Sequence, residues 1–238
     1  MSFLFTERPF SGSTFRPRPE IFLDQETKTL IVATPWGSRE SARRVIERMK
    51  DYLSIAREDA EATSPFERLS CLSTHANRLR IATLLANEAL YREENKNEYR
   101  SGVEVFAGIL EDDEFVWLQN GNPQILLSRP GRKPLPLGSQ IDLSFDLSEG
   151  SELLPGLPSQ MLGLDSSLNV SLNSFRARPG DKVALISHSH LPEAVYGLQD
   201  SQLTVESMSR LIATACPDHA FWVGVLELGM AGTAKAAS

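Results

Sequence analysis

A change in hydrophobic period near Gly102 constrains the fold of this 238-residue chain more than any other feature. Before Gly102, apolar residues recur every three or four positions, which predicts one helix from Ser38 to Ala56 and another from Ser64 to Tyr91. After it, short apolar runs bounded by turn residues are typical of strands. The later predicted elements are strands over 103–110, 114–118, 125–127, 169–178 and 183–186, a helix over 205–215 and a strand over 221–228. Because each element type comes in runs, the pattern indicates an α+β fold with mostly antiparallel sheets.

The rest of the chain adds a hairpin, a long loop and two ends. Residues 20–34 hold two apolar runs around an Asp-Gln-Glu-Thr turn, which predicts a β-hairpin. Residues 129–165 are rich in Pro, Gly and Ser, so we expect a loop with one short strand over 141–145. Neither a repeat nor a linker divides the sequence. We therefore expect a single domain over residues 1–228 and a disordered tail over 229–238.

Composition excludes several classes of protein. The 24 basic and 31 acidic residues give a net charge of −7, which disfavours nucleic acid as a partner because its phosphates would be repelled. No apolar run approaches the roughly 18 residues that a membrane helix needs, and we expect no membrane association. The first ten residues lack the basic lead and apolar stretch of a secretion signal. Cys71 and Cys216 are too few for a disulfide framework, so a reduced, cytoplasmic location is expected.

Short motifs in a fixed order then suggest a family. They are Ala33-Thr34-Pro35-Trp36-Gly37 before a helix, Asn120-Gly121-Asn122-Pro123, Leu162-Gly163, Arg178-Pro179-Gly180-Asp181 before an apolar strand, and Asp218-His219 before the last strand. From about Arg16 to Leu228, the chain resembles the PP2C/PPM metal-dependent protein serine/threonine phosphatases, including their bacterial sporulation and stress-response branch. The resemblance implies a four-layer α-β-β-α sandwich, in which two mostly antiparallel sheets pack face to face with helices outside. It also implies two Mg²⁺ or Mn²⁺ ions between the sheets and a metal-bound water that attacks phosphoserine.

The chain departs from the family where the resemblance places metal ligands. Thr34-Pro35 and His188-Ser189 stand in place of two Asp-Gly pairs, and Asn122 replaces an aspartate. The full set of degenerate positions is Glu20, Thr34, Pro35, Asn122, His188, Ser189 and Asp218. Two dications about 4 Å apart repel by roughly 17 kcal/mol at an effective dielectric constant of 20, and carboxylates normally offset that repulsion. With Glu20 and Asp218 as the remaining acids, we predict a pseudophosphatase with no catalytic residues and no cofactor.

Three functions remain open. The first is a regulatory or scaffold role that binds a protein partner, a phosphoprotein among the candidates, through Arg16, Arg18, Trp36 and His219. The second is an enzyme with a single altered divalent-metal site, either centred on Glu20, His188 and Asp218 or built from His188, His190 and Asp218. The third is a sensor of phosphate or another small ligand. Against a metal site, the loop histidines are also expected simply to have replaced ligands once metal binding was lost.

Overall fold

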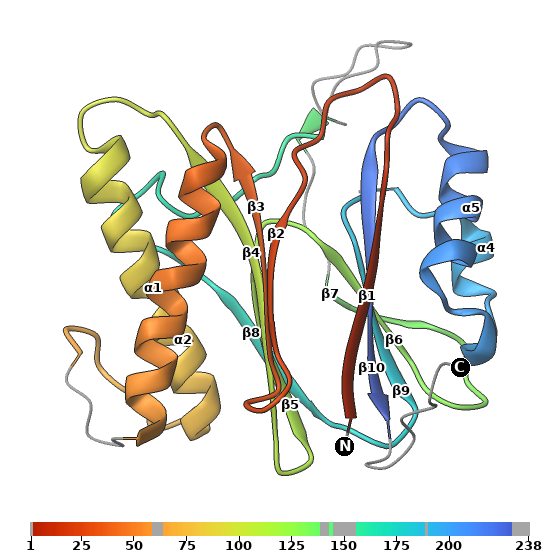
Figure 1. Cartoon of the computed structure of the whole chain (residues 1–238), viewed down its shortest axis with the longest axis horizontal. Helices are drawn as coiled ribbons and strands as arrows, with labels where there is room; N and C mark the ends of the chain where they lie inside the picture. The colour runs from red at the N-terminus through yellow and green to blue at the C-terminus, as the bar shows by residue number, and fades with distance from the viewer. Residues whose placement is uncertain (1, 59–63, 139–142, 145–155, 189, 230–238) are drawn as a thin grey trace, which may run out of the picture. The chain divides into compact units, whose positions relative to one another are not determined.

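The computed structural model describes residues 2–58, 64–138, 143–144, 156–188 and 190–229 (Figure 1). These residues divide into two compact units. We call residues 17–121 and 160–176 the central unit, and residues 1–16, 122–159 and 177–238 the terminal unit. Each unit contains one five-stranded antiparallel sheet with helices packed on it.

The sheet of the central unit has the strand order β2-β3-β4-β5-β8. Its strands are β2 (Glu20–Asp24), β3 (Thr29–Trp36), β4 (Gly102–Glu111), β5 (Glu114–Asn120) and β8 (Ser171–Arg176). Helices α1 (Arg39–Glu58) and α2 (Thr74–Leu90) cover one face, and a π-helical turn, η1 (Tyr91–Asn95), continues α2. Ile31 and Ala33 from β3 pack with Met49 of α1 and Leu79 of α2 in a buried core. Burial of this apolar face positions the ends of β3 and β4.

The sheet of the terminal unit has the order β1-β10-β9-β6-β7. Its strands are β1 (Ser2–Phe10), β6 (Gln124–Ser128), β7 (Leu135–Gly138), β9 (Asp181–Ile186) and β10 (Phe221–Gly229). Among the described residues, its helical elements include α4 (Glu193–Tyr196), a 3₁₀ turn η2 (Asp200–Gln202) and α5 (Val205–Ala215). Met208 and Ile212 of α5 pack on Phe221 and Val223 of β10. The C-terminal end of α5 leads into a short turn before β10.

The predicted α+β class, the hairpin over 20–34 and the antiparallel strands are confirmed. The predicted start of the second helix at Ser64 is wrong, because α2 begins at Thr74. The Ser73 side chain caps it by accepting a hydrogen bond from the Ala76 amide. Asn77 holds the preceding segment out of the helix, since its side chain bonds the amide and carbonyl of Leu69 and the carbonyl of Leu72. Ser64 instead accepts from the Phe66 amide in a local turn.

Two strands were not predicted, and some predictions cannot be compared. Strand β1 alternates poorly in hydrophobicity, and β7 is a short, partly exposed edge strand. Most of the predicted strand over 141–145 lies outside the described residues. The tail was predicted to begin at Gly229, but Gly229 ends β10, and residues 230–238 lie outside the described residues. Across the part of the chain that the structure describes, each helix is too short or too polar to cross a bilayer.

Candidate functional site

In the central unit, Thr34 and Trp36 lie at the end of β3 on the sheet face away from the helices. Their alternate neighbour Ala33 packs in the helix-side core, and side chains alternate along a strand. Thr34 is paired in register with Glu104 of β4, a carboxylate that is only 1% exposed. The Trp36 indole nitrogen donates a hydrogen bond of 2.9 Å to Glu104 Oε2. A buried acid therefore lies beside the degenerate Thr34-Pro35 pair and is bonded to the neighbouring tryptophan.

The other acid at this end of the sheet, Glu20, is held by arginines. Glu20 begins β2, and its Oε1 accepts a hydrogen bond from Arg39 Nε of α1. Arg43 Nε lies 3.7 Å from the same oxygen. Arg18, a predicted partner-binding residue, is exposed just before β2. The charge of Glu20 is thus matched by cations from the first turns of α1.

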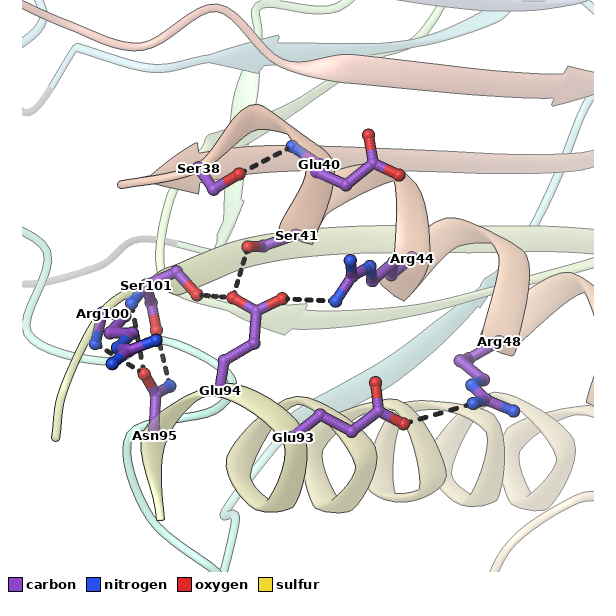
Figure 2. Close-up of polar contacts among 10 residues, drawn as sticks. All are labelled: Ser38, Glu40, Ser41, Arg44, Arg48, Glu93, Glu94, Asn95, Arg100 and Ser101. Atoms are coloured by element: carbon purple, nitrogen blue, oxygen red, sulfur yellow. Dashed lines mark hydrogen bonds and ion pairs between the residues drawn. The ribbon is translucent and has the colours of Figure 1, made fainter. Parts of the chain in front are cut away.

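Acids of η1 bind side chains of α1 (Figure 2). Glu94 accepts hydrogen bonds from Ser41 Oγ at 2.8 Å and Arg44 Nη1 at 3.1 Å, and a further one from Ser101 Oγ. Arg48 pairs with Glu93 at 3.3 Å. Glu94 therefore links the first turns of α1 to the segment that enters β4.

Asn95 fixes that same segment from the inside. Its amide nitrogen donates to the carbonyls of Ser101 (2.6 Å) and Gly163 (2.7 Å). Its oxygen accepts from the amides of Arg100 (2.7 Å) and Ser101 (3.1 Å), as Figure 2 shows in part. Gly37 packs against this segment with φ of +111°, where a Cβ would lie 2.5 Å from the Arg100 carbonyl oxygen. The turn from β3 into α1 is thereby held in one conformation.

In the terminal unit, His188 follows β9 and is almost fully buried. Ser187 extends the sheet pairing, because its amide donates to the Trp222 carbonyl (2.9 Å) and its hydroxyl accepts from the Trp222 amide (2.8 Å). The His188 ring packs edge-on against Phe221, with 5.9 Å between centroids, and against His219, with 5.3 Å. Burial is the largest cause and lowers the pKa of His188 to about 4. The hydrogen bond to the His190 backbone acts in the opposite direction, and electrostatic interactions with His219 and Arg16 add to the lowering. His188 is therefore a neutral imidazole at pH 7.

The turn after α5 brings a thiol and a second imidazole to His188. Cys216 caps α5, and the His219 amide donates to the Cys216 carbonyl at 3.3 Å across Pro217 and Asp218. One ligand atom from each of His188, Cys216 and His219 lies within 4.8 Å of the others. His219 Nδ1 is buried and forms no hydrogen bond with any described residue. These three side chains form a cluster of the kind that binds a transition metal.

The N-terminal segment holds this turn in place. Ser13 Oγ donates to Asp218 Oδ1 at 3.1 Å, and the Thr14 amide donates to the Asp218 carbonyl at 3.0 Å. Thr14 Oγ1 accepts from the Ala220 amide at 3.0 Å. A Cβ on Gly12 would lie 2.4 Å from the Asp218 carbonyl oxygen. The Asp218 carboxylate is therefore bonded to the residues that clamp the turn.

Comparisons with known proteins identify the fold. No family model matches the chain, and no curated protein matches it in sequence. Solved structures do match. PppA, "a key regulatory component of T6SS in Pseudomonas aeruginosa", has a TM-score of 0.67 at 16% identity over 95% of this chain and 98% of its own. The Mycobacterium tuberculosis serine/threonine phosphatase PstP/Ppp has a TM-score of 0.64 at 18% identity over 97% and 100%.

The chain has the fold of the PPM phosphatases. A further match is the catalytic domain of the serine/threonine protein phosphatase PstP in complex with two manganese ions, with a TM-score of 0.60 at 17% identity over 96% of this chain and 99% of that one. The predicted resemblance to bacterial PP2C/PPM phosphatases is thus confirmed at the level of the fold. At these identities, the fold does not carry the activity with it.

The structure gathers some predicted site residues of this PPM-fold chain and separates others. It brings His188 next to His219 and also next to Cys216, which was not among the predicted site residues. The two other residues of the predicted metal set differ: His190 is exposed and contacts His188 through its backbone, and Asp218 bonds Ser13. Asn122 is buried before Pro123. Ser189 lies outside the described residues.

Sequence reasoning missed two residues. Glu104 was assigned only to a strand, and its register opposite Thr34 depends on pairing between segments far apart in the chain. Cys216 could have been found, because Cys216-Pro217-Asp218-His219 has the Cys-x-x-His spacing that a tight turn converts into a pair of neighbouring metal ligands.

Proposed function

We propose that this PPM-fold chain lacks the two-metal phosphatase activity and works as a regulatory or scaffold protein that binds another protein in the cytoplasm. The observation that carries the proposal is the donor set at the positions that resemble the family's ligands. Thr34 offers a neutral hydroxyl, His188 offers a nitrogen donor, and Asn122 offers a neutral amide. Mg²⁺ and Mn²⁺ prefer anionic oxygen donors.

The acids that remain already have partners. Glu20 pairs with Arg39 and Arg43, Glu104 accepts from Trp36, and Asp218 accepts from Ser13. Even if all three acids reached one site, their three negative charges would not balance the four positive charges of two dications. At the roughly 17 kcal/mol of repulsion estimated above, such a cluster is strongly disfavoured. The residues present therefore do not fit a binuclear Mg²⁺ or Mn²⁺ centre.

A phosphoprotein is the partner class that this proposal favours. Arg16 and the exposed Arg18 supply cationic side chains from the segment before β2, and guanidinium groups bind phosphate in a bidentate manner. Retention of the whole fold over 95–97% of the chain without the ligand set is what selection for binding, rather than for hydrolysis, would leave.

Hydrolysis of a phosphoserine peptide tests the proposal directly. Wild-type protein with Mn²⁺ or Mg²⁺ is expected to release phosphate at the rate of the buffer, and Asp218→Ala is expected to change nothing. The variant Thr34→Asp/Pro35→Gly/His188→Asp restores acids at the degenerate positions, and any Mn²⁺-dependent gain in its activity would support the charge argument. Metal-dependent turnover by the wild type that Asp218→Ala abolishes would overturn the proposal.

Binding of the same peptide tests the second half. Fluorescence anisotropy is expected to show tighter binding of the phosphorylated form than of its unphosphorylated control, with weaker binding by Arg16→Ala/Arg18→Ala. Arg210→Ala, an exposed arginine on α5, is the matched control. Equal binding of the two peptides would contradict a phosphoprotein partner.

An active phosphatase is the competing candidate. It is favoured by the match to phosphatase structures along nearly the whole chain and by Glu104, a buried acid that sequence reasoning did not count. The hydrolysis assay separates the two candidates, because only the active enzyme depends on both the metal and Asp218.

A further inference from the structure

We propose that His188, Cys216 and His219 bind one Zn²⁺ ion. Their ligand atoms lie within 4.8 Å of one another. A tetrahedral zinc ion with bonds of about 2.0–2.3 Å separates its ligands by about 3.5 Å, so the side chains need to close by little more than 1 Å. Small rotations about side-chain bonds supply such a movement.

The chemistry of the three groups selects the metal. One thiolate and two imidazoles are the soft and borderline donors that zinc accepts, whereas Mg²⁺ and Mn²⁺ prefer carboxylate oxygens. A single thiolate leaves a complex of charge +1, because both histidines bind as neutral rings. With a single ion, this site also lacks the repulsion between two dications that disfavours a two-metal centre in the same fold.

The surroundings of His188 match those of a zinc ligand. Its Nδ1 lies 2.6 Å from the His190 carbonyl oxygen, a contact that requires a proton on Nδ1. The longer contact of 3.2 Å from the His190 amide to Nδ1 would require the opposite tautomer, and the shorter contact decides between them. Nε2 then carries the free lone pair. Zinc-bound histidines characteristically donate their other ring N–H to a carbonyl or carboxylate.

The turn supplies the other two ligands from a rigid frame. Cys216 and His219 occupy the first and fourth positions of the turn that the His219 amide closes. Gly12, Ser13 and Thr14 pack against the intervening residues and fix their backbone. His219 Nδ1 is buried and forms no hydrogen bond with any described residue, which costs free energy. A bond from Nδ1 to the metal would remove that cost.

Three protein ligands leave one tetrahedral position for water or an added ligand, as in open zinc sites. Cys216 and His219 are each partly exposed, which gives the ion a path from solvent. The site belongs entirely to the terminal unit and uses no carboxylate. Zinc binding at this site can be measured without any readout of phosphatase activity.

Cobalt substitution tests the proposal without relying on a variant. Co²⁺ added to the metal-free full-length protein under reducing conditions is expected to produce the visible bands of tetrahedral Co²⁺ and a thiolate-to-cobalt charge-transfer band, each saturating at one ion per chain. Stoichiometric Zn²⁺ is expected to remove both signals. Absence of the charge-transfer band would overturn the proposal, since it reports the metal–sulfur bond itself.

Variants then assign the ligands. Cys216→Ser, His188→Gln and His219→Gln are each expected to weaken Zn²⁺ binding by more than about 100-fold in competition with a chromogenic chelator, beyond the 10- to 100-fold loss that follows removal of an outer partner. Cys71→Ser, at the other cysteine, and His190→Ala, which keeps the carbonyl that contacts His188, are the matched controls and are expected to bind as the wild type does. Equal affinity of Cys216→Ser and Cys71→Ser would refute the assignment.

Discussion

Replacement of Asn95 by alanine is expected to lower the stability of the central unit strongly. The side chain is 3% exposed and forms four hydrogen bonds, to the amides of Arg100 and Ser101 and to the carbonyls of Ser101 and Gly163. Truncation leaves these four backbone groups without their partner. A buried polar group that loses its hydrogen bond costs about 1–3 kcal/mol, and water can reach part of the exposed Arg100 segment. We therefore expect a loss of about 3 kcal/mol.

Urea unfolding, followed by tryptophan fluorescence, measures this loss. With a slope of about 3 kcal/mol per molar urea, the midpoint is expected to fall by about 1 M. Hydrogen exchange should localise the effect to residues 95–104, whose backbone Asn95 holds. Asn95→Asp is expected to cost at least as much as the alanine variant, because a carboxylate oxygen would then face the two carbonyls that now accept from the amide nitrogen.

The exposed neighbour Lys96 supplies the control, since Lys96→Ala removes a side chain of similar position that forms no part of this network. Its free energy of unfolding is expected to stay within about 0.5 kcal/mol of that of the wild type. A change of similar size for Asn95→Ala would show that solvent replaces the four bonds at no cost, and the argument from burial would be wrong.

Three further predictions concern the two candidate sites. Trp36→Phe removes the indole donor to the buried Glu104 and is expected to lower stability by about 1.5–3 kcal/mol by urea unfolding, whereas Trp36→Phe/Glu104→Gln should recover part of that loss; no recovery would place the cost elsewhere. In metal-free protein, the lowered pKa of His188 means that the unfolded chain binds more protons than the folded chain between pH 6.5 and about 4. The free energy of unfolding is therefore expected to fall by about 3 kcal/mol as the pH drops through that range. His188→Gln should flatten this part of the stability profile, and an unchanged slope would contradict the prediction. Gly12→Ala places a Cβ 2.4 Å from the Asp218 carbonyl oxygen and is expected to lower the thermal midpoint by displacing the 216–219 turn. Gly131→Ala is the control: its Cβ would have nothing within 4 Å, and its φ of +73° should cost only a smaller backbone strain. Equal shifts of the two midpoints would argue against the clash.

The fold could be predicted because its main signals are local. Helix α1 and α5 and the strands with strong apolar runs follow from period and turn residues, as the hairpin around residues 24–29 illustrates. The start of α2 could not be predicted, because Asn77 reaches back to Leu69 and Leu72 and makes a non-helical segment more favourable than the earlier capping signal at Ser64. Strand β1 was missed for a related reason: it is specified by its pairing with β10, more than 200 residues away.

The candidate sites divide in the same way. The absence of acids at Thr34-Pro35 and His188-Ser189 is a property of residue types and needs no structure. The partner of each remaining acid does need one, because Glu20 meets Arg39 and Glu104 meets Trp36 only through tertiary packing. The proposed zinc ligands lie between these extremes. Cys216 and His219 are three residues apart and could have been paired from spacing, but His188 joins them through its position after β9.

The fold can stay the same while the residues at the ligand positions differ, because other residues supply most of the free energy of folding. The buried apolar faces of the two sheets and their helices supply most of the stabilisation, and the degenerate positions that the structure describes belong to neither of these cores. Substitution of a metal-binding carboxylate by threonine or histidine even removes a like-charge repulsion that an empty site would otherwise retain. If the chain binds rather than hydrolyses, as proposed above, such positions are free to form other contacts, such as that of Glu20 with Arg39, while the cores stay fixed. The cluster of His188, Cys216 and His219 is a set of metal donors that such changes allow.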